Sequence, residues 1–121
     1  MIKLMLLLKR KPGLTPEQFR DHYENVHVPL GLKYVGHLLA DFRRHYPDAM
    51  MSLADGQPLG CEYDAISVYS FKHAAAFTEI QKILADPQVA RILTEDEAQF
   101  LDRSASRMGR CEVVEAERTI S

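Results

Sequence analysis

The sequence predicts an α+β domain in which four antiparallel strands carry helices on one face of their sheet. Two observations favour this fold class. Four segments have the length and residue content of strands, and two longer segments have helical periodicity. Their order is strand, helix, strand, strand, helix, strand. Two right-handed crossovers then place both helical segments on the same side of the sheet.

The composition bounds the fold and its partners. A chain of 121 residues with 46% hydrophobic and 26% charged residues is typical of one globular domain, here residues 1–121. The net charge of -2 and the scattered basic residues argue against nucleic acid or an anionic membrane as a partner. No apolar run approaches the roughly 18 residues of a membrane span. Cys61 and Cys111 lack metal-ligand spacing, so we expect free thiols in a reducing cytoplasm.

The first strand and helix have clear sequence signals. Residues 2–8 form a continuous apolar run of strand length, and Lys-Pro-Gly at 11–13 ends it. Thr15 is a helix N-cap, followed by proline at the first helical position and by Gln18 at the capping-box position. The apolar stripe of this helix, which should face the sheet, consists of Phe19, Tyr23, Val26 and Leu30.

A histidine and a proline interrupt this helix. Pro29 lacks a backbone donor and disfavours helical geometry in the preceding residue, so we expect the helix to end or kink near His27 and Val28. This places His27 at a helix end. A histidine there can cap the last carbonyl groups, or it can be presented to a site.

The middle of the chain contains two strands and a long connection. The first of these strands covers residues 37–46. Residues 47–60 form either a long loop that acts as a lid or binding loop, or a mobile hairpin connection without chemical function. The second covers residues 63–71. The period of two predicts an unusually polar face on the first strand, made of His37, Leu39, Asp41, Arg43 and His45.

The last third of the chain is helical and then extended. A helix begins near Lys72, Asp86-Pro87 restarts a short helix, and the capping-box pattern from Thr94 opens another short one. Residues 107–117 form the last strand. The result is a ferredoxin-like βαββαβ fold with one face of its sheet open. Because that face carries apolar side chains, we expect two copies to pair through it as a homodimer.

Three stretches resemble the EthD domain family: LLLKRKPGLTPEQFRDHYENVHVPL, CEYDAISVYSF and DEAQFLDRSASRMGRCEVVEA. The most specific parts are the Lys-x-Pro-Gly turn and the His-x-Pro-Leu sequence at 27–30. The resemblance implies a dimeric α+β barrel. It also implies enzymes without a cofactor that bind a small hydrophobic carbonyl or aromatic ligand. Near relatives include a protein needed for ether breakdown by an oxygenase system and a muconolactone methylisomerase.

The resemblance and the residue types together indicate a candidate active site. His27 is the candidate acid-base residue, and Asp41 is the candidate orienting carboxylate or second acid. We expect four further side chains to bind substrate by hydrogen bonds to a developing enolate or phenolate oxygen: Tyr34, His37, Tyr63 and Tyr69. Structural alternatives stay open, since Asp41 can pair with Arg43 or Arg44, and both Tyr63 and Tyr69 can be core residues.

Three classes of function fit these residues. The first is a cofactor-independent lyase or isomerase that uses His27. The second is an oxidoreductase of the monooxygenase type, and the third is a non-catalytic accessory protein that binds a hydrophobic intermediate for an oxygenase pathway. The sequence has no metal-ligand spacing, phosphate-binding glycine loop, nucleotide fingerprint or nucleophile elbow, which argues against a metal site, kinases and dehydrogenases.

Overall fold

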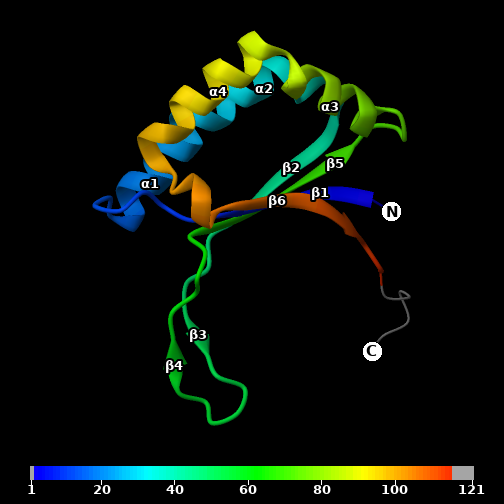
Figure 1. Cartoon of the computed structure of the whole chain (residues 1–121). Helices are drawn as coiled ribbons and strands as arrows, with labels where there is room; N and C mark the ends of the chain where they lie inside the picture. The colour runs from blue at the N-terminus through cyan, green and yellow to red at the C-terminus, as the bar shows by residue number, and fades with distance from the viewer. Residues whose placement is uncertain (1, 116–121) are drawn as a thin grey trace.

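The computed structural model describes residues 2–115. Four antiparallel strands form one sheet in the order β2-β5-β1-β6, and the helices lie together on one face of it (Figure 1). This arrangement confirms the predicted ferredoxin-like α+β fold. The strands of the sheet are β1 (Ile2–Leu8), β2 (Leu39–His45), β5 (Ala65–Phe71) and β6 (Arg107–Glu112).

The helical layer has two parts. The first runs through α1 (Pro16–His22), a π-turn (Tyr23–His27), α2 (Val28–Val35) and a 3-10 turn (Gly36–Leu38). The second contains α3 (Ala76–Ala85), α4 (Pro87–Phe100) and a 3-10 turn (Arg103–Ala105).

The predicted start of α1 is confirmed. The Thr15 hydroxyl accepts a hydrogen bond from the Gln18 backbone N–H at 3.1 Å, and the Gln18 side chain accepts one from the Thr15 N–H at 2.9 Å. These reciprocal bonds satisfy two backbone donors that the helix itself leaves unpaired. In the first turns of this helix, the Phe19 side chain is buried in the core between the helices and the sheet.

Of the two outcomes expected near His27 and Val28, an end or a kink, the end does not occur: the regular α-helix is interrupted by a π-turn and continues to Val35. In that turn the Val28 N–H donates to the Tyr23 carbonyl, five residues back. The wider turn leaves Pro29 in the first turn of α2, where a missing N–H costs little. The extra residue in this turn moves the inward-facing positions toward the C-terminus. Val28 is therefore buried, whereas Val26, which the sequence predicts to face the sheet, is 45% exposed.

Strand β2 also differs from its prediction. It begins at Leu39, since residues 36–38 form the 3-10 turn, and its register shifts between Leu39 and Asp41. This β-bulge breaks the alternation, so Leu39 and Phe42 face the helices while Asp41 lies on the opposite face. The predicted polar face is therefore only partly present: Asp41, Arg43 and His45 still share one face of the strand, opposite Ser70, Val68 and Ile66 of β5, whereas His37 and Leu39 are not part of it.

The segment 47–60 forms a hairpin arm, as in the second of the two alternatives left open for it. Its short strands β3 (Met50–Met51) and β4 (Pro58–Leu59) pair antiparallel. The arm projects from the body on the side of the sheet away from the helices (Figure 1).

The C-terminal third has fewer breaks than predicted. Helix α4 runs for 14 residues through Thr94, because no helix-breaking residue follows Pro87 within it. Asp86 caps this helix through hydrogen bonds from two backbone N–H groups, as its Asp-Pro start predicts. The last strand ends at Glu112, and positions 116–117 of the predicted strand lie outside the described residues.

Candidate functional site

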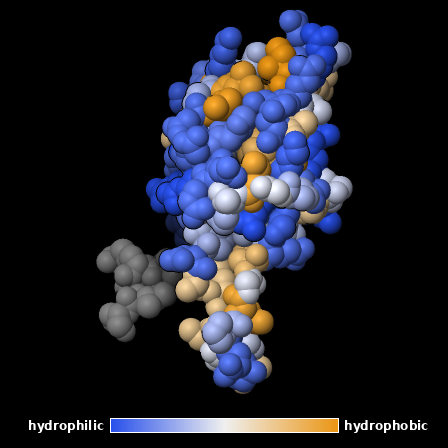
Figure 2. Space-filling view, turned by 90° about the vertical axis from the view of Figure 1, so that its left-hand side faces the viewer, coloured by the Kyte–Doolittle hydropathy of each residue, from blue (hydrophilic) through white to orange (hydrophobic). Residues whose placement is uncertain are grey.

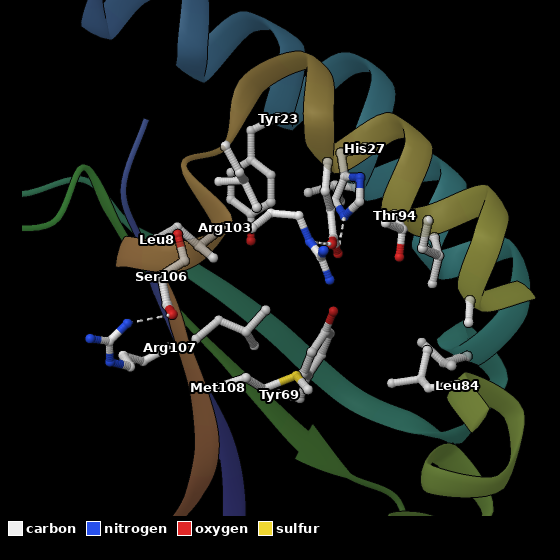
Figure 3. A pocket seen from close by; sticks show the side chains of 18 of the residues that line it. Leu8, Tyr23, His27, Tyr69, Leu84, Thr94, Arg103, Ser106, Arg107 and Met108 are labelled. Atoms are coloured by element: carbon white, nitrogen blue, oxygen red, sulfur yellow. Dashed lines mark hydrogen bonds and ion pairs between the residues drawn. The ribbon is translucent and has the colours of Figure 1, made fainter. Parts of the chain in front are cut away.

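A cavity of about 750 Å³ lies between the helices and the sheet (Figure 3). Its walls are largely apolar, and a volume of this size accommodates a small organic molecule. The apolar lining comes mainly from Leu6, Leu8, Val28, Val35, Phe42, Ile80, Leu84, Leu93, Leu101 and Met108. The polar side chains that matter most for chemistry are Tyr23, His27, Tyr69, Glu97 and Arg103.

His27 enters the cavity wall from the π-turn. Its Nδ1 lies 2.8 Å from Oδ2 of Asp96 on α4, and both side chains are mostly buried, at 16% and 14% exposure. The other Asp96 oxygen lies 3.0 Å from Nε2 of His22. One carboxylate thus joins two histidines that sit five residues apart on the first helical segment.

This pairing decides how His27 presents its two nitrogens. An ionised carboxylate can only accept hydrogen bonds, so the hydrogen lies on Nδ1 of His27, which donates it to Asp96. In the neutral ring, Nε2 then carries a lone pair. Nε2 faces Glu97, whose Oε2 lies 3.9 Å away, beyond hydrogen-bond length. The ring also packs against buried Phe100, with ring centroids 4.9 Å apart.

Glu97 and Arg103 form the charged side of the cavity. Arg103 Nε donates to Glu97 Oε1 at 3.0 Å, and the Arg103 side chain is 56% exposed. Glu97 therefore lies between the imidazole of His27 and the guanidinium of Arg103. The guanidinium points inward from the 3-10 turn that follows α4 (Figure 3).

Tyr69 supplies a neutral donor. Burial, and then the negative charge of Glu97, raise the pKa of Tyr69 to about 12. The phenol is therefore protonated near neutral pH. Its ring stacks on Phe42 at 4.1 Å between centroids, and its hydroxyl points toward the centre of the cavity (Figure 3). The hydroxyl makes no hydrogen bond with any residue from 2 to 115, so it is available to a ligand.

Tyr23 has a structural role in the same wall. It is 2% exposed, and its hydroxyl shares a 2.7 Å hydrogen bond with the fully buried Ser67 on β5. Burial raises the pKa of the Tyr23 phenol far above its usual range. A tyrosine in this state holds α1 and the π-turn to the sheet.

The structure brings together only two of the six predicted site residues, His27 and Tyr69. Asp41 lies on the sheet face away from the helices, with its Oδ2 3.6 Å from Arg43 Nε. The other three lie outside the cavity lining: Tyr34 is partly buried in the α2 core, His37 is exposed, and Tyr63 precedes β5. The carboxylate beside His27 is Asp96.

Sequence reasoning misses Asp96 and Glu97 because the Thr94 stretch resembles a new helix start. A signal for Glu97 does exist. Leu93, Glu97 and Leu101 are spaced by four, and all three line the cavity. If the helical period is continued through Thr94, this spacing puts Glu97 on the inward stripe.

None of the helices in the described part of the chain has the length and apolar character needed to cross a membrane. Within residues 2–115, no three His, Cys, Asp or Glu side chains are grouped as metal ligands would be.

Comparisons with known proteins agree with the fold. An EthD family protein from Bacillus halodurans is 18% identical, with a TM-score of 0.61 over 94% of this chain and 99% of that one. An EthD-like protein from Ralstonia eutropha is 19% identical, with a TM-score of 0.63 over 98% and 95%. A Bacteroides fragilis protein, described as dimeric, ferredoxin-like and of unknown function, is 10% identical, with a TM-score of 0.53 over 93% and 95%.

The sequence comparison gives the family. No curated protein matches the chain. The family model of the EthD domain matches residues 11–104, which covers most of the chain and includes His27, Asp96 and Glu97. The chain therefore belongs to the EthD domain family.

Proposed function

We propose that the cavity binds a small hydrophobic carbonyl or aromatic compound and that His27 transfers a proton on it without a cofactor. The reaction class is that of a lyase or isomerase. One observation carries the proposal: the Nδ1–H of His27 is held by Asp96 at 2.8 Å, so its Nε2 lone pair lies on the cavity side without a hydrogen bond, with Glu97 Oε2 3.9 Å away. This is the arrangement that a general base requires.

The proton transfer follows from this arrangement. Nε2 of His27 takes a proton from the carbon next to a carbonyl group; the C–H electron pair forms a carbon–carbon double bond, and the π pair of the carbonyl group moves to its oxygen, which gives an enolate. Asp96 stabilises the imidazolium that forms, because its carboxylate already accepts the Nδ1–H. His27 then returns the proton to another atom, which gives isomerisation, or to a departing group, which gives elimination.

Tyr69 is suited to the developing oxyanion. Its phenol is protonated and lacks a hydrogen-bond partner among the described residues, so it can donate to an enolate or phenolate oxygen. The apolar walls add to this effect, because a hydrogen bond to an anion is stronger where water is excluded. The stacked Phe42 holds the Tyr69 ring in position.

We also propose that the chain is a homodimer that pairs through the open face of its sheet. Across β1 and β5 this face carries Met5 opposite Val68 and Leu7 opposite Ile66, and no helix of residues 2–115 covers them (Figure 1). A second copy would remove this apolar strip from water. The Bacteroides protein with the same fold is described as dimeric.

The hairpin arm supports this pairing. It projects on the same side as the open face, and Met51 and Leu59 on it are 66% and 58% exposed. Apolar surface is visible on the arm between its polar tip and the body (Figure 2).

Sedimentation velocity should give a dimer for the wild type and a monomer for Val68→Lys. Glu79→Lys, on the exposed side of α3, is the control. A monomeric wild type contradicts the pairing.

The enzyme proposal is tested by product formation in air and under nitrogen. The protein is purified natively and extracted with organic solvent, and bound molecules are identified by mass spectrometry. The proposal predicts that the recovered ligand is converted equally with and without oxygen. Conversion that requires oxygen would instead indicate a monooxygenase. A ligand that is bound but never converted would indicate an accessory protein.

A further inference from the structure

We infer that the cavity selects amphiphilic anions, with an apolar body beside Gly31 and a carboxylate or similar oxyanion paired with Arg103. This inference rests on the proposed function, since it assigns the ligand class of the same cavity. It makes Arg103 a binding residue that fixes the direction of the ligand.

Arg103 has hydrogen-bond donors at the cavity that are not used by the described residues. Its Nε edge is occupied, because Nε donates to Glu97 Oε1 at 3.0 Å. Neither terminal nitrogen makes a hydrogen bond with a residue in the described range 2–115. The end of a guanidinium carries two parallel N–H groups whose spacing matches the two oxygens of a carboxylate. Glu97 therefore orients Arg103 and leaves this end free.

A neighbouring arginine shows the contrast. Arg107 also lines the cavity, but its Nη1 donates to the carbonyl oxygens of Ser104 at 2.9 Å and Ser106 at 3.0 Å. These bonds fasten the Arg107 guanidinium to the backbone at the rim. Arg103 has no such backbone bond within residues 2–115, and it points inward (Figure 3).

Tyr69 reinforces the preference for an oxyanion. Its hydroxyl and the Arg103 guanidinium point toward the same central space (Figure 3). Both are donors near neutral pH, since the phenol is protonated and a guanidinium always carries its charge. Two convergent donors suit a ligand oxygen that bears negative charge.

Gly31 leaves room for the apolar body. It lies within α2 and lines the cavity, and a Cβ added there would meet no atom within 4 Å. Glycine inside a helix is less stable than alanine, so the missing side chain has a structural cost. The space that it leaves adjoins apolar walls such as Val28 and Val35.

Two fluorescent probes with the same apolar body test the inference. 1-Anilinonaphthalene-8-sulfonate carries an anionic group, and N-phenyl-1-naphthylamine is its neutral counterpart. Dissociation constants are measured by titration of the purified protein. For Arg103→Gln we expect about a tenfold loss of affinity for the sulfonate and less than a twofold change for the neutral probe. Arg107→Gln is the matched control and should change neither constant by more than about twofold.

A second variant tests whether both probes bind inside the cavity. Gly31→Leu fills the space beside α2 and should weaken both probes at least about tenfold. Gly36→Ala, outside the cavity lining, should weaken neither. Circular dichroism checks that each variant is folded.

Three results would overturn the inference: no binding of either probe to the wild type, equal weakening of both probes by Arg103→Gln, or no weakening of the sulfonate. Each is read from binding alone, whereas the proposed function is read from substrate conversion. Loss of anion selectivity with intact conversion contradicts only the ligand assignment. Intact selectivity without conversion contradicts only the enzyme proposal.

Discussion

Asp96 accepts a hydrogen bond from Nδ1 of His27 at 2.8 Å, although the two residues lie 69 positions apart in the chain. The bond joins α4 to the π-turn and fixes which nitrogen of the imidazole faces the cavity. Its geometry depends on the π-turn, which rotates His27 inward, and on the continuity of α4, which carries Asp96 to it.

Asp96→Asn should impair catalysis more than folding. An amide cannot stabilise an imidazolium as a carboxylate does, so we expect kcat to fall by about a hundredfold and stability by about 1–3 kcal/mol. The ¹⁵N NMR signals of His27 should change from the Nδ1–H tautomer to a mixture. Glu95→Gln, the exposed neighbour on α4, is the control. An unchanged tautomer in Asp96→Asn would refute the positioning role.

Tyr69→Phe should distinguish the catalytic contribution of the Tyr69 hydroxyl from the structural contribution of its ring. The stack on Phe42 is kept, so the free energy of unfolding should change by less than about 1 kcal/mol. Loss of a donor to the oxyanion should lower kcat by about ten- to a hundredfold. Tyr63→Phe, outside the cavity lining, should leave kcat unchanged. Equal rates for Tyr69→Phe and wild type would exclude Tyr69 from the reaction.

Gly31→Ala should stabilise the protein by about 0.5–1 kcal/mol, since alanine favours a helix over glycine and the added Cβ meets open space. Urea unfolding measures the change. Gly36→Ala, whose Cβ would lie 3.5 Å from Leu32, tests the same propensity outside the cavity. Destabilisation by Gly31→Ala alone would show that the space beside α2 is not open.

The ion pair between Glu24 and Arg44 should make the free energy of unfolding fall at acid pH. Arg44 donates to both Glu24 oxygens, at 2.6 Å and 2.9 Å, and Tyr46 donates as well. Chiefly through the Arg44 bonds, the pKa of Glu24 lies below its ordinary value of 4.5. Because the folded pKa is the lower one, this stabilisation is complete above about pH 5 and is lost as pH falls through the folded pKa.

Urea unfolding between about pH 3 and pH 6 checks this dependence. Glu24→Gln should have a flatter stability profile than the wild type over that range, and Glu17→Gln, in the first turn of α1, should not. Parallel profiles for the wild type and Glu24→Gln would contradict the assignment.

Local signals predicted the outline of the fold. The Thr15 capping box, the Asp86-Pro87 start and the order of strands and helices are all present in the structure. Each of these depends on residues close in sequence. The resemblance to the EthD domain family was likewise confirmed by the match over residues 11–104.

The features that build the site could not be predicted in the same way. The π-turn and the bulge at Leu39 each add one residue to a regular period, and tertiary packing decides where that residue goes. As a result Asp41 turned away from the cavity. The Asp96 bond to His27 crosses 69 positions, and no local pattern encodes it.

Hydrogen exchange catalysed by His27 is the most direct test of its proposed acid-base role. The protein is incubated in D₂O under nitrogen with a panel of aryl ketones, and deuterium entry next to the carbonyl is followed by NMR. His27→Asn keeps a donor near the Nδ1 position for Asp96 and removes the Nε2 base, while His45→Asn on β2 is the control. We expect deuterium exchange with the wild type and the control, and an exchange rate lower by about a hundredfold or more with His27→Asn. Equal exchange rates in wild type and His27→Asn would contradict this acid-base role.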